Sequence, residues 1–353
     1  MLLYIHIPFC DSKCFYCAFN SYTDLHILKD QYIQALKKQL EFELKNHNKK
    51  IKTVFIGGGT PSTIEAKKYE EILQIIKPYL ENNTCEITIE ANPNSAKNRW
   101  LEKIYNMGIN RISFGVQSFN DKKLDFLGRN HNKTQALEAI NKAYKIGFKN
   151  INCDIIYDTK LDTKELIDND LNIISSLPIN HVSAYSLTIE EGTKFFHKSN
   201  VKVEDENMAK YIFERLNNMG FYQYEISNFA KNENARSKHN LGYWEYKEYL
   251  GIGAGAVGRV ANRRYYPPSS LQEYIEDPLN QQIEHLTQKE MKNEQIFLGL
   301  RSNVGVKKGI FTKKELERVE ILINENKLEE KNDIVYNKNF LLSDEIALWI
   351  DSE

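Results

Sequence analysis

Short apolar runs alternate with longer stretches of helical periodicity over the first part of the chain. Apolar side chains recur every three or four residues from Ile33 to Leu44 and again from Tyr69 to Leu80, as on one face of an amphipathic helix. Repeated alternation of strand and helix indicates a parallel sheet, and about six units rather than eight predict an α/β fold: a partial (βα)6 barrel, open at its side. The predicted strands are Leu3–His6, Thr53–Ile56, Glu86–Glu90, Arg111–Gly115, Ile151–Ile156 and His181–Leu187.

The pattern changes after Pro267. Short helical stretches follow, and then two strand-like runs, Ile334–Asn337 and Phe340–Leu342, an order typical of a winged-helix module. We therefore predict a first domain over residues 1–265 and a smaller C-terminal helical, winged-helix-like domain over residues 266–353. The charges of this tail are mixed, which favours a cover over one opening of the barrel rather than nucleic-acid binding.

Composition narrows the class of protein. The 353 residues are enough for a large domain plus a smaller one, and 47 Lys and Arg nearly balance 48 Asp and Glu, so bulk charge indicates no nucleic-acid or anionic-membrane partner. Leu2–Ile7 read as a strand rather than a signal peptide, and no run approaches the roughly 20 apolar residues of a membrane span. Of five cysteines, Cys85 and Cys153 stand alone in apolar runs and read as core residues. We expect a cytoplasmic protein with reduced cysteines.

The other three cysteines, Cys10, Cys14 and Cys17, are close together on one predicted loop. A structural zinc ion and an ordinary electron-carrying 4Fe–4S cluster each take four protein ligands, whereas three thiolates leave one iron open to a small molecule. Tyr16 stands where it can pack over such a cluster. The alternative is a zinc site that His6 completes.

Polar residues follow the ends of the predicted strands, where parallel barrels gather their functional groups. The run Gly57–Pro61 follows the second strand, and its three glycines allow backbone groups to approach a ligand closely. Each residue alone is a weak signal, but several on one rim predict a ligand site there. The other polar residues at or after the ends of the predicted strands are Glu90, Gln117, Asp154, Tyr185 and Ser186.

The Cys-x3-Cys-x2-Cys spacing, with an aromatic residue before the third cysteine and Gly-Gly-Gly-Thr-Pro further on, resembles the radical S-adenosylmethionine (SAM) superfamily. Finer motifs resemble the HemN/HemW group, which contains oxygen-independent coproporphyrinogen III oxidases and heme chaperones. The resemblance runs in order from Tyr4 to about Gly258 and implies a radical SAM barrel. The motifs are Tyr4–Cys10, Ile89–Pro93, Arg111–Phe119 and Leu127–His131.

Three features resemble the heme-chaperone branch of this group rather than the oxidase branch. Phe19 stands where the oxidases carry a further cysteine, and only nine residues precede Cys10. His239, Tyr243 and Trp244 match the branch's His-Asn-x-x-Tyr-Trp motif, which is linked to heme. An imidazole can ligate heme iron and the two aromatic rings offer flat apolar surface, while helix capping and core packing are the alternative roles.

The resemblance implies that the three clustered cysteines bind three irons of a 4Fe–4S cluster and that SAM chelates the fourth. A guanidinium suits a carboxylate, and carboxylates suit ammonium and ribose hydroxyl donors, although an ordinary salt bridge is the alternative for Arg129 and Asp154. His6 and His131 receive no role. The implied SAM-binding residues are Tyr4, Gly58, Gly59, Thr60, Glu90, Gln117, Arg129 and Asp154.

The implied function is that of a heme chaperone, which binds heme and transfers it to acceptor proteins, including membrane-associated respiratory proteins. The alternative is coproporphyrinogen III oxidase (dehydrogenase) activity through a 5′-deoxyadenosyl radical. The resemblance also implies a flavodoxin- or ferredoxin-like reductant. One departure concerns the group's Tyr-Gly-Leu-Pro-Gly turn after the fifth strand: here Tyr157 is followed by Asp158–Asp162, so the conformation of this loop does not follow from the resemblance.

Overall fold

The first six strands form the parallel centre of one sheet in the computed structural model, which describes residues 1–203 and 205–352. Each pairs in parallel with the next, so their carboxyl ends meet at one edge. The sequence prediction of these strands is confirmed to within two residues at every end. They are β1 (Leu2–Ile7), β2 (Thr53–Gly58), β3 (Glu86–Ala91), β4 (Arg111–Gln117), β5 (Asn150–Tyr157) and β6 (His181–Ser186).

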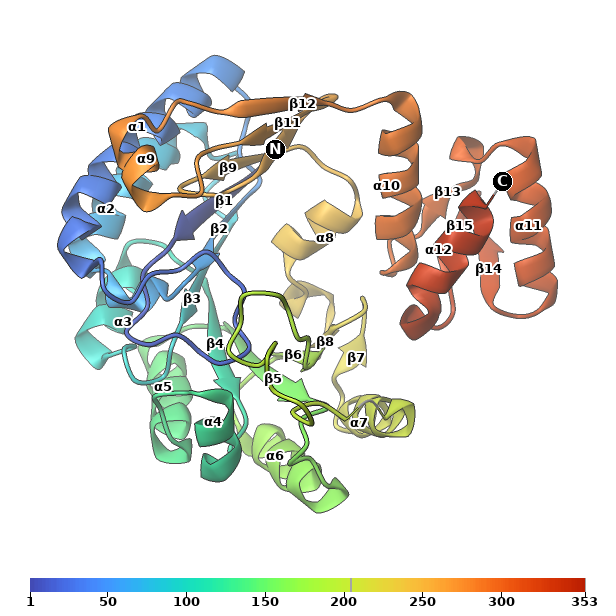
Figure 1. Cartoon of the computed structure of the whole chain (residues 1–353), viewed down its shortest axis with the longest axis horizontal. Helices are drawn as coiled ribbons and strands as arrows, with labels where there is room; N and C mark the ends of the chain where they lie inside the picture. Colours follow the sequence, from blue (N-terminus) through green and yellow to red (C-terminus); the bar gives the residue numbers. More distant parts are fainter. Residues whose placement is uncertain (204, 353) are drawn as a thin grey trace.

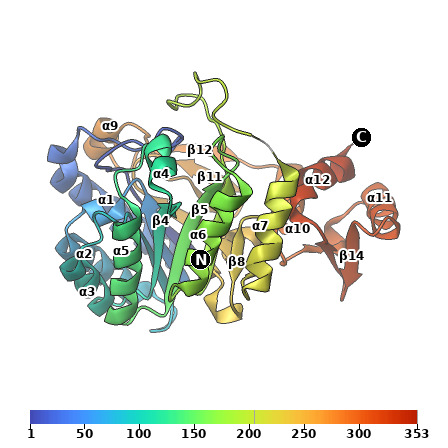
Figure 2. The same ribbon diagram turned by 90° about the horizontal axis from the view of Figure 1, so that it is seen from below.

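Helices follow the strands and cover the outer face of the sheet (Figures 1 and 2). Except for the short helix Asp121–Leu127, their apolar stripes pack on strands that are buried on both faces, and together these residues form the larger hydrophobic core of the described chain. The two predicted helical stripes, from Ile33 and from Tyr69, both belong to this core. The helices are α1 (Lys29–His47), α2 (Ala66–Ile76), α3 (Asn98–Asn106), α4 (Asp121–Leu127), α5 (Lys133–Ile146) and α6 (Lys164–Ser176).

Shorter elements extend the sheet on both sides. The strands are β7 (Tyr222–Gln223), β8 (Asn228–Ala230), β9 (Tyr249–Ile252), β10 (Gly258–Val260), β11 (Arg263–Tyr266) and β12 (Gln282–His285), and the helices are α7 (Glu206–Asn218), α8 (Lys238–Trp244) and α9 (Leu271–Glu276). The sheet has twelve strands in the order β12-β11-β10-β9-β1-β2-β3-β4-β5-β6-β8-β7. Its end strands β12 and β7 are not paired with each other within the described residues, so the sheet is open rather than a closed barrel.

A separate small core holds the C-terminal part together, seen to one side of the main sheet in Figure 1. It combines the helices α10 (Gln288–Leu300), α11 (Lys313–Asn324) and α12 (Ser343–Asp351) with a three-stranded antiparallel sheet of β13 (Val306–Lys307), β15 (Ile334–Asn337) and β14 (Leu328–Lys331). The hairpin prediction was wrong in one part. The strands of the hairpin are β14 and β15. Phe340–Leu342 is instead a 3-10 turn that leads into α12, and the Asn339 side chain caps the start of this turn.

The position of the boundary between the two parts follows from the cores. Leu271 and Tyr274 of α9 belong to the larger core, and β12 is part of the twelve-stranded sheet. We therefore propose that the first unit extends to about residue 286, beyond the break predicted at 265. Among the described residues, no helix is long and apolar enough to cross a membrane.

The altered loop after β5 is fixed by buried polar contacts. Asp162 accepts a hydrogen bond from Nζ of Lys123 at 2.5 Å, and the two side chains are 4% and 0% exposed. Asp158 adopts a left-handed backbone conformation with φ of 65°, at the position of the group's first turn glycine, and accepts a hydrogen bond from Ser186 at 2.6 Å. The loop thus keeps a glycine-like conformation without the glycine.

This conformation predicts how Asp158 tolerates substitution. We expect Asp158→Gly to change the free energy of unfolding by no more than about 1 kcal/mol, because relief of strain offsets the lost hydrogen bond. Asp158→Val is expected to cost about 2–3 kcal/mol, since a β-branched residue is strained at positive φ and leaves Ser186 without its acceptor. Urea unfolding of both variants measures the difference; equal losses would contradict it.

Candidate functional site

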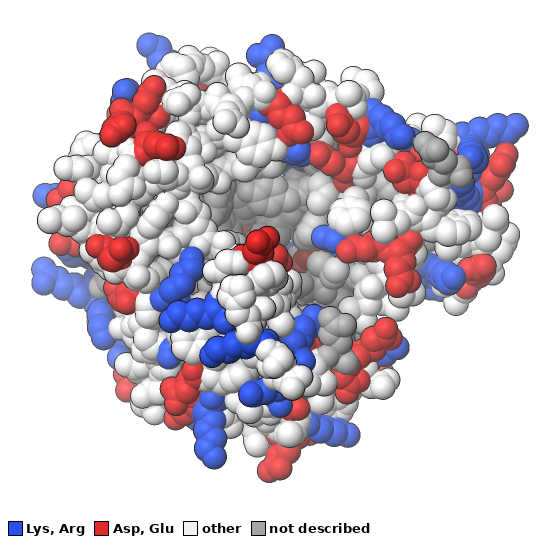
Figure 3. Space-filling model, in the orientation of Figure 1, with Lys and Arg blue, Asp and Glu red and all other residues white. Residues whose placement is uncertain are grey.

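The predicted rim residues lie around one cavity of about 580 Å³ at the carboxyl ends of the parallel strands. The face seen in Figure 3 is hollowed at its centre. Of the predicted cluster and SAM residues, all but Tyr4 line this cavity, which we call the main cavity. They are Cys10, Cys14, Cys17, Gly58, Gly59, Thr60, Glu90, Gln117, Arg129 and Asp154.

The cysteine loop is held by backbone contacts on both sides. Cys10 N–H donates to the carbonyl of Tyr22 at 3.0 Å, and Phe15 N–H donates to the carbonyl of Leu127 at 3.0 Å. Phe195, from the segment after β6, donates its N–H to the carbonyl of Phe15 and packs its ring against the Phe15 ring. These contacts hold the loop in place through the protein's own backbone.

The three clustered thiols differ in their exposure and in their hydrogen bonds. Cys14 and Cys17 are partly exposed to the cavity, and burial raises the pKa of the Cys10 and Cys17 thiols. The Thr60 hydroxyl donates to Sγ of Cys10 at 3.3 Å, which lowers the pKa of that thiol in part.

The glycine run is needed because its backbone passes very close to neighbouring atoms. A Cβ on Gly58 would lie 2.3 Å from the His6 ring, and its φ of 110° is itself unfavourable for other residues. A Cβ on Gly57 would lie 2.8 Å from Oε2 of Glu90, and one on Gly59 would meet the backbone carbonyl oxygens of Ile7 and Phe9. Gly58 N–H donates to Glu90 at 3.0 Å, so the run positions one of the predicted SAM residues directly.

Arg129 connects the cysteine loop to the sheet. Its guanidinium donates to Sγ of Cys14 at 3.2 Å, to the Gly115 carbonyl at 2.5 Å and to Oδ1 of Asn92. Its buried Nε has no hydrogen-bond partner among the described residues. A buried N–H donor of a cationic group that lines a cavity suits an anionic or carbonyl acceptor on a bound molecule.

Two carboxyl groups face the same space. Burial, together with the neighbouring Asp154, raises the pKa of Glu90 to about 8. Burial also raises the pKa of Asp154 to about 6, although hydrogen bonds from Ser183, Asn152 and Ser113 lower it in part. Both carboxyl groups are therefore poised to take up a cationic or hydroxyl-bearing ligand, which would favour their ionised forms.

The Glu90 shift predicts a pH dependence for the cluster-free, ligand-free protein. The folded pKa of about 8 lies above the unfolded value of 4.5, so between these values the folded state binds more protons and its stability falls as pH rises. At about 1.4 kcal/mol per pKa unit, the free energy of unfolding changes by at most about 5 kcal/mol over this range. Because the two carboxyl groups are neighbours, this change belongs to the pair of Glu90 and Asp154. We expect Glu90→Gln to remove most of this slope between pH 5 and 9 in urea midpoints; parallel curves for variant and wild type would contradict it.

Gln117 and Tyr4 differ from the other predicted SAM-binding residues in their geometry or their place. Gln117 lines the main cavity with a positive φ of 69° at a bulge between β4 and β5, a strained geometry that is common next to functional sites. Tyr4 lines a smaller cavity instead, and its hydroxyl is hydrogen-bonded to Nδ1 of His6 at 2.9 Å. Phe55 lines both cavities, so the two adjoin at its side chain.

Sequence reasoning missed several residues of the main cavity. Asn92 binds Arg129, and Asn152 donates to Asp154 at 2.6 Å and to Ser113 at 2.7 Å. Residues two apart in a strand lie on the same face of the sheet. Polar residues at alternate positions of a buried strand, such as Asn152 and Asp154, could therefore have indicated this cavity. Arg111 also lines the cavity; it begins a predicted strand and the motif Arg111–Phe119, but it was not predicted as a site residue.

The predicted heme motif lies on α8, where Asn240 lines the main cavity but His239, Tyr243 and Trp244 do not. His239 is 1% exposed; its Nδ1 is hydrogen-bonded to the Thr53 hydroxyl at 2.8 Å and its Nε2 to the Tyr243 hydroxyl at 3.1 Å. Burial lowers the pKa of His239 to about 3, so its ring is neutral. Tyr243 and His239 line the smaller cavity with Tyr4, whereas Trp244 is not among the residues that line either cavity.

Comparison with known proteins agrees with this geometry. Residues 4–171 match the model of the radical SAM superfamily. The chain is 36% identical to the heme chaperone HemW of Lactococcus lactis over 86% of this chain and 82% of that protein. It is 34% identical to the HemW of Bacillus subtilis, over 88% and 86% of the two chains.

The fold also has a solved counterpart. The coproporphyrinogen III oxidase HemN from Escherichia coli, a radical SAM enzyme, superposes with a TM-score of 0.84 over 99% of this chain and 90% of that chain, at 20% identity. That likeness extends to the C-terminal part and shows the shared fold alone. The identity to the chaperones, over most of both chains, decides the family: the chain belongs to the HemW family of the radical SAM superfamily.

Proposed function

We propose that this protein is a heme chaperone that carries a 4Fe–4S cluster and SAM, binds heme and passes it to acceptor proteins. The observation that carries this proposal is the identity to HemW proteins over most of both chains. The motif residues His239, Tyr243 and Trp244 on one short helix support it, since two of them line cavities beside the cluster site.

The proposed cofactor site is the main cavity. Cys10, Cys14 and Cys17 would hold three irons, and the cavity beside them has the donors and acceptors that an amino acid and a nucleoside require. A reduced cluster supplies an electron to the SAM sulfonium. We assign Arg129 to the SAM carboxylate and Glu90 and Asp154 to its ammonium and ribose hydroxyl groups.

The residues of the chain supply positioning and exclusion of water at this site. Gly58–Thr60 hold the backbone close to the methionyl end, and Gln117 is aimed by its strained backbone toward the same space. The segment after β6, including Leu187 and Phe195, packs over the cysteine loop and limits access from that side.

The proposed partners follow from the proposed role as a heme chaperone with a 4Fe–4S cluster. Heme acceptors would include membrane-associated respiratory proteins, and a flavodoxin- or ferredoxin-like protein would reduce the cluster. We place the protein in the cytoplasm, because its clustered thiols need a reducing compartment to remain metal ligands.

Anaerobic titration of the cluster-loaded protein with ferric heme tests this function. We expect absorbance changes that saturate at one heme per chain, followed by transfer when an apo heme protein is added. Absence of saturable binding would contradict the proposal. The oxidase alternative predicts formation of protoporphyrinogen from coproporphyrinogen III with reductant and SAM, and that activity would favour it instead.

A further inference from the structure

Three exposed lysines lie over aromatic rings in and beside the cysteine loop. Nζ of Lys194 lies 4.8 Å from the centre of the Phe15 ring, and Nζ of Lys198 lies 5.4 Å from it. Nζ of Lys160 lies 5.3 Å from the centre of the Phe126 ring. We call Lys160, Lys194 and Lys198 the lysine patch. Figure 2 shows the yellow-green segment after β6, which carries two of these lysines, extending beyond the ends of the strands.

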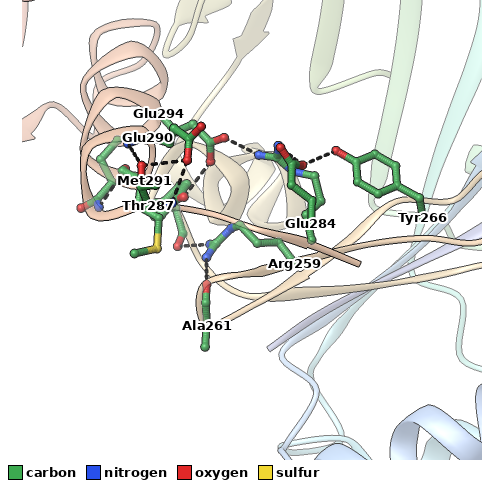
Figure 4. Close-up of polar contacts among 11 residues, drawn as sticks. Arg259, Ala261, Tyr266, Glu284, Thr287, Glu290, Met291 and Glu294 are labelled. Carbon is green, nitrogen blue, oxygen red and sulfur yellow. Dashed lines mark hydrogen bonds and ion pairs between the residues drawn. The ribbon is translucent and has the colours of Figure 1, made fainter. Parts of the chain in front are cut away.

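The charge of the lysine patch is not neutralised by neighbouring carboxylates. Arg264 is a contrasting case, because it pairs with the carboxylates of Glu284 and Glu294, which Figure 4 shows. The three patch lysines have no carboxylate partner in the described part of the chain. A cation–π contact at an exposed site contributes only about 0.5–1 kcal/mol, so the ammonium groups remain available for carboxylates of a partner.

The positive charge is a local feature of this face. The whole chain has a formal net charge of −1, yet Lys and Arg side chains gather just below the central hollow in Figure 3. The acidic residues of the segment after β6, Glu190 and Glu191, precede its lysines, and Glu190 lines the main cavity. A cluster of one sign of charge on a nearly neutral protein attracts a partner surface of the opposite sign.

The rings below the lysine patch connect it to the cysteine loop. The centre of the Phe195 ring lies 6.0 Å from that of Phe15 and 5.1 Å from that of Phe126. Phe15 directly follows Cys14, and its ring packs so closely on Gly128 that a Cβ there would lie 2.7 Å from it. None of the three patch lysines lines the main cavity. A protein bound to the patch would therefore rest against the cysteine loop without entering the main cavity.

We propose that the lysine patch docks the acidic face of a one-electron carrier protein, which reduces the cluster from this side. This inference rests on the proposed cluster site and adds the surface at which the electron enters. One electron leaves the reduced flavin or iron–sulfur centre of the carrier, which is oxidised, and enters the cluster, which is reduced; no covalent bond forms or breaks. Complementary charges raise the rate of association, and weak electron-transfer complexes bury less than about 1,200 Å², so a small patch is sufficient.

Anaerobic isothermal titration calorimetry of the full cluster-loaded chain with oxidised flavodoxin tests the docking surface. We expect binding at low ionic strength that weakens as salt is added, because salt screens exposed charges. The double variant Lys194→Glu/Lys198→Glu should bind about tenfold more weakly or worse. Lys313→Glu/Lys314→Glu is the matched control, since it makes the same change of net charge at two exposed lysines that begin α11. It should bind flavodoxin as wild type does.

The rate of cluster reduction gives a second measurement. Stopped-flow absorbance with reduced flavodoxin should show reduction about tenfold slower in Lys194→Glu/Lys198→Glu than in the control variant. Dithionite, a small reductant that needs no docking surface, should reduce the cluster of both variants to the same extent. Lys194→Arg/Lys198→Arg keeps both charges and should match wild type in binding and in rate.

Wild type that binds no flavodoxin, or binds it without any dependence on salt, would overturn the docking surface while leaving the proposed function intact. Equal binding by the two charge-reversed variants would overturn it as well. Binding to vesicles of anionic phospholipid that only Lys194→Glu/Lys198→Glu loses, with its flavodoxin binding unchanged, would assign the patch to a membrane surface instead. A wild-type chain that takes up no iron and sulfide on reconstitution would contradict the function on which the inference rests.

Discussion

Replacing Cys17 with serine is expected to abolish the iron–sulfur cluster and, with it, measurable SAM binding. Each of the three cysteines would supply one thiolate, and the hydroxyl of serine is a far weaker iron ligand, so a chain with two thiolates cannot hold the cluster firmly. Anaerobically reconstituted wild type should contain about four irons and four sulfides per chain. The variant should contain a small fraction of both and lose the brown absorbance.

The control for this experiment is Cys85→Ala. Cys85 is buried, its thiol contacts the backbone carbonyl of Ile51 at 3.4 Å, and it does not line the main cavity. This variant should keep its iron, sulfide and SAM binding. Wild-type iron content in Cys17→Ser, or zinc in place of iron and sulfide in the wild type, would contradict the cluster assignment.

Arg129→Gln is expected to give the second largest effect. The change removes a cation that donates to Cys14, to the Gly115 carbonyl and to Asn92, and whose buried Nε is left for the ligand. A charge-assisted hydrogen bond is worth about 1.5–3 kcal/mol, so we expect SAM affinity to fall about 10–100-fold. Equilibrium dialysis or tryptophan fluorescence with SAM on cluster-loaded protein measures this loss.

Two further variants separate charge from geometry at Arg129. Arg129→Lys keeps the charge but cannot reproduce the planar, forked donor set, so its SAM affinity should lie between those of wild type and Arg129→Gln. Arg99→Gln changes an exposed arginine on α3 and should have no effect. Equal SAM affinity in Arg129→Gln and Arg99→Gln would show that Arg129 serves only the fold.

The three cavities suggest how the two ligand sites are related. Phe55 and Asn240 line both the main and the smaller cavity, and Tyr243 lines both the smaller cavity and a further cavity between α8 and the C-terminal part. The amide N–H groups of Lys238 and His239 at the start of α8 donate to the Glu86 carboxylate on β3. The helix that carries the motif is therefore anchored in the same sheet that holds the cofactor site.

The sequence alone determined the local pattern of this protein. Runs of buried apolar residues and amphipathic stripes depend on neighbours within a few residues, so β1–β6 and the helices between them could be predicted. The cysteine loop and the glycine run are likewise contiguous. The cofactor residues after the strands could be grouped because parallel strands bring their carboxyl ends to one edge.

Only the tertiary structure decided what depends on contacts between distant residues. β9 pairs with β1, where Tyr249 lies opposite Leu2, and β14 rather than Phe340–Leu342 pairs with β15. Such pairings depend on register and burial between distant segments, which the sequence of a short strand does not encode. The motif on α8 was visible in the sequence, but not that His239 is enclosed between Thr53 and Tyr243 while the Tyr243 ring faces a cavity. Which side chain meets a ligand is set by the packing of elements from opposite ends of the chain, and that packing exists only in the folded molecule.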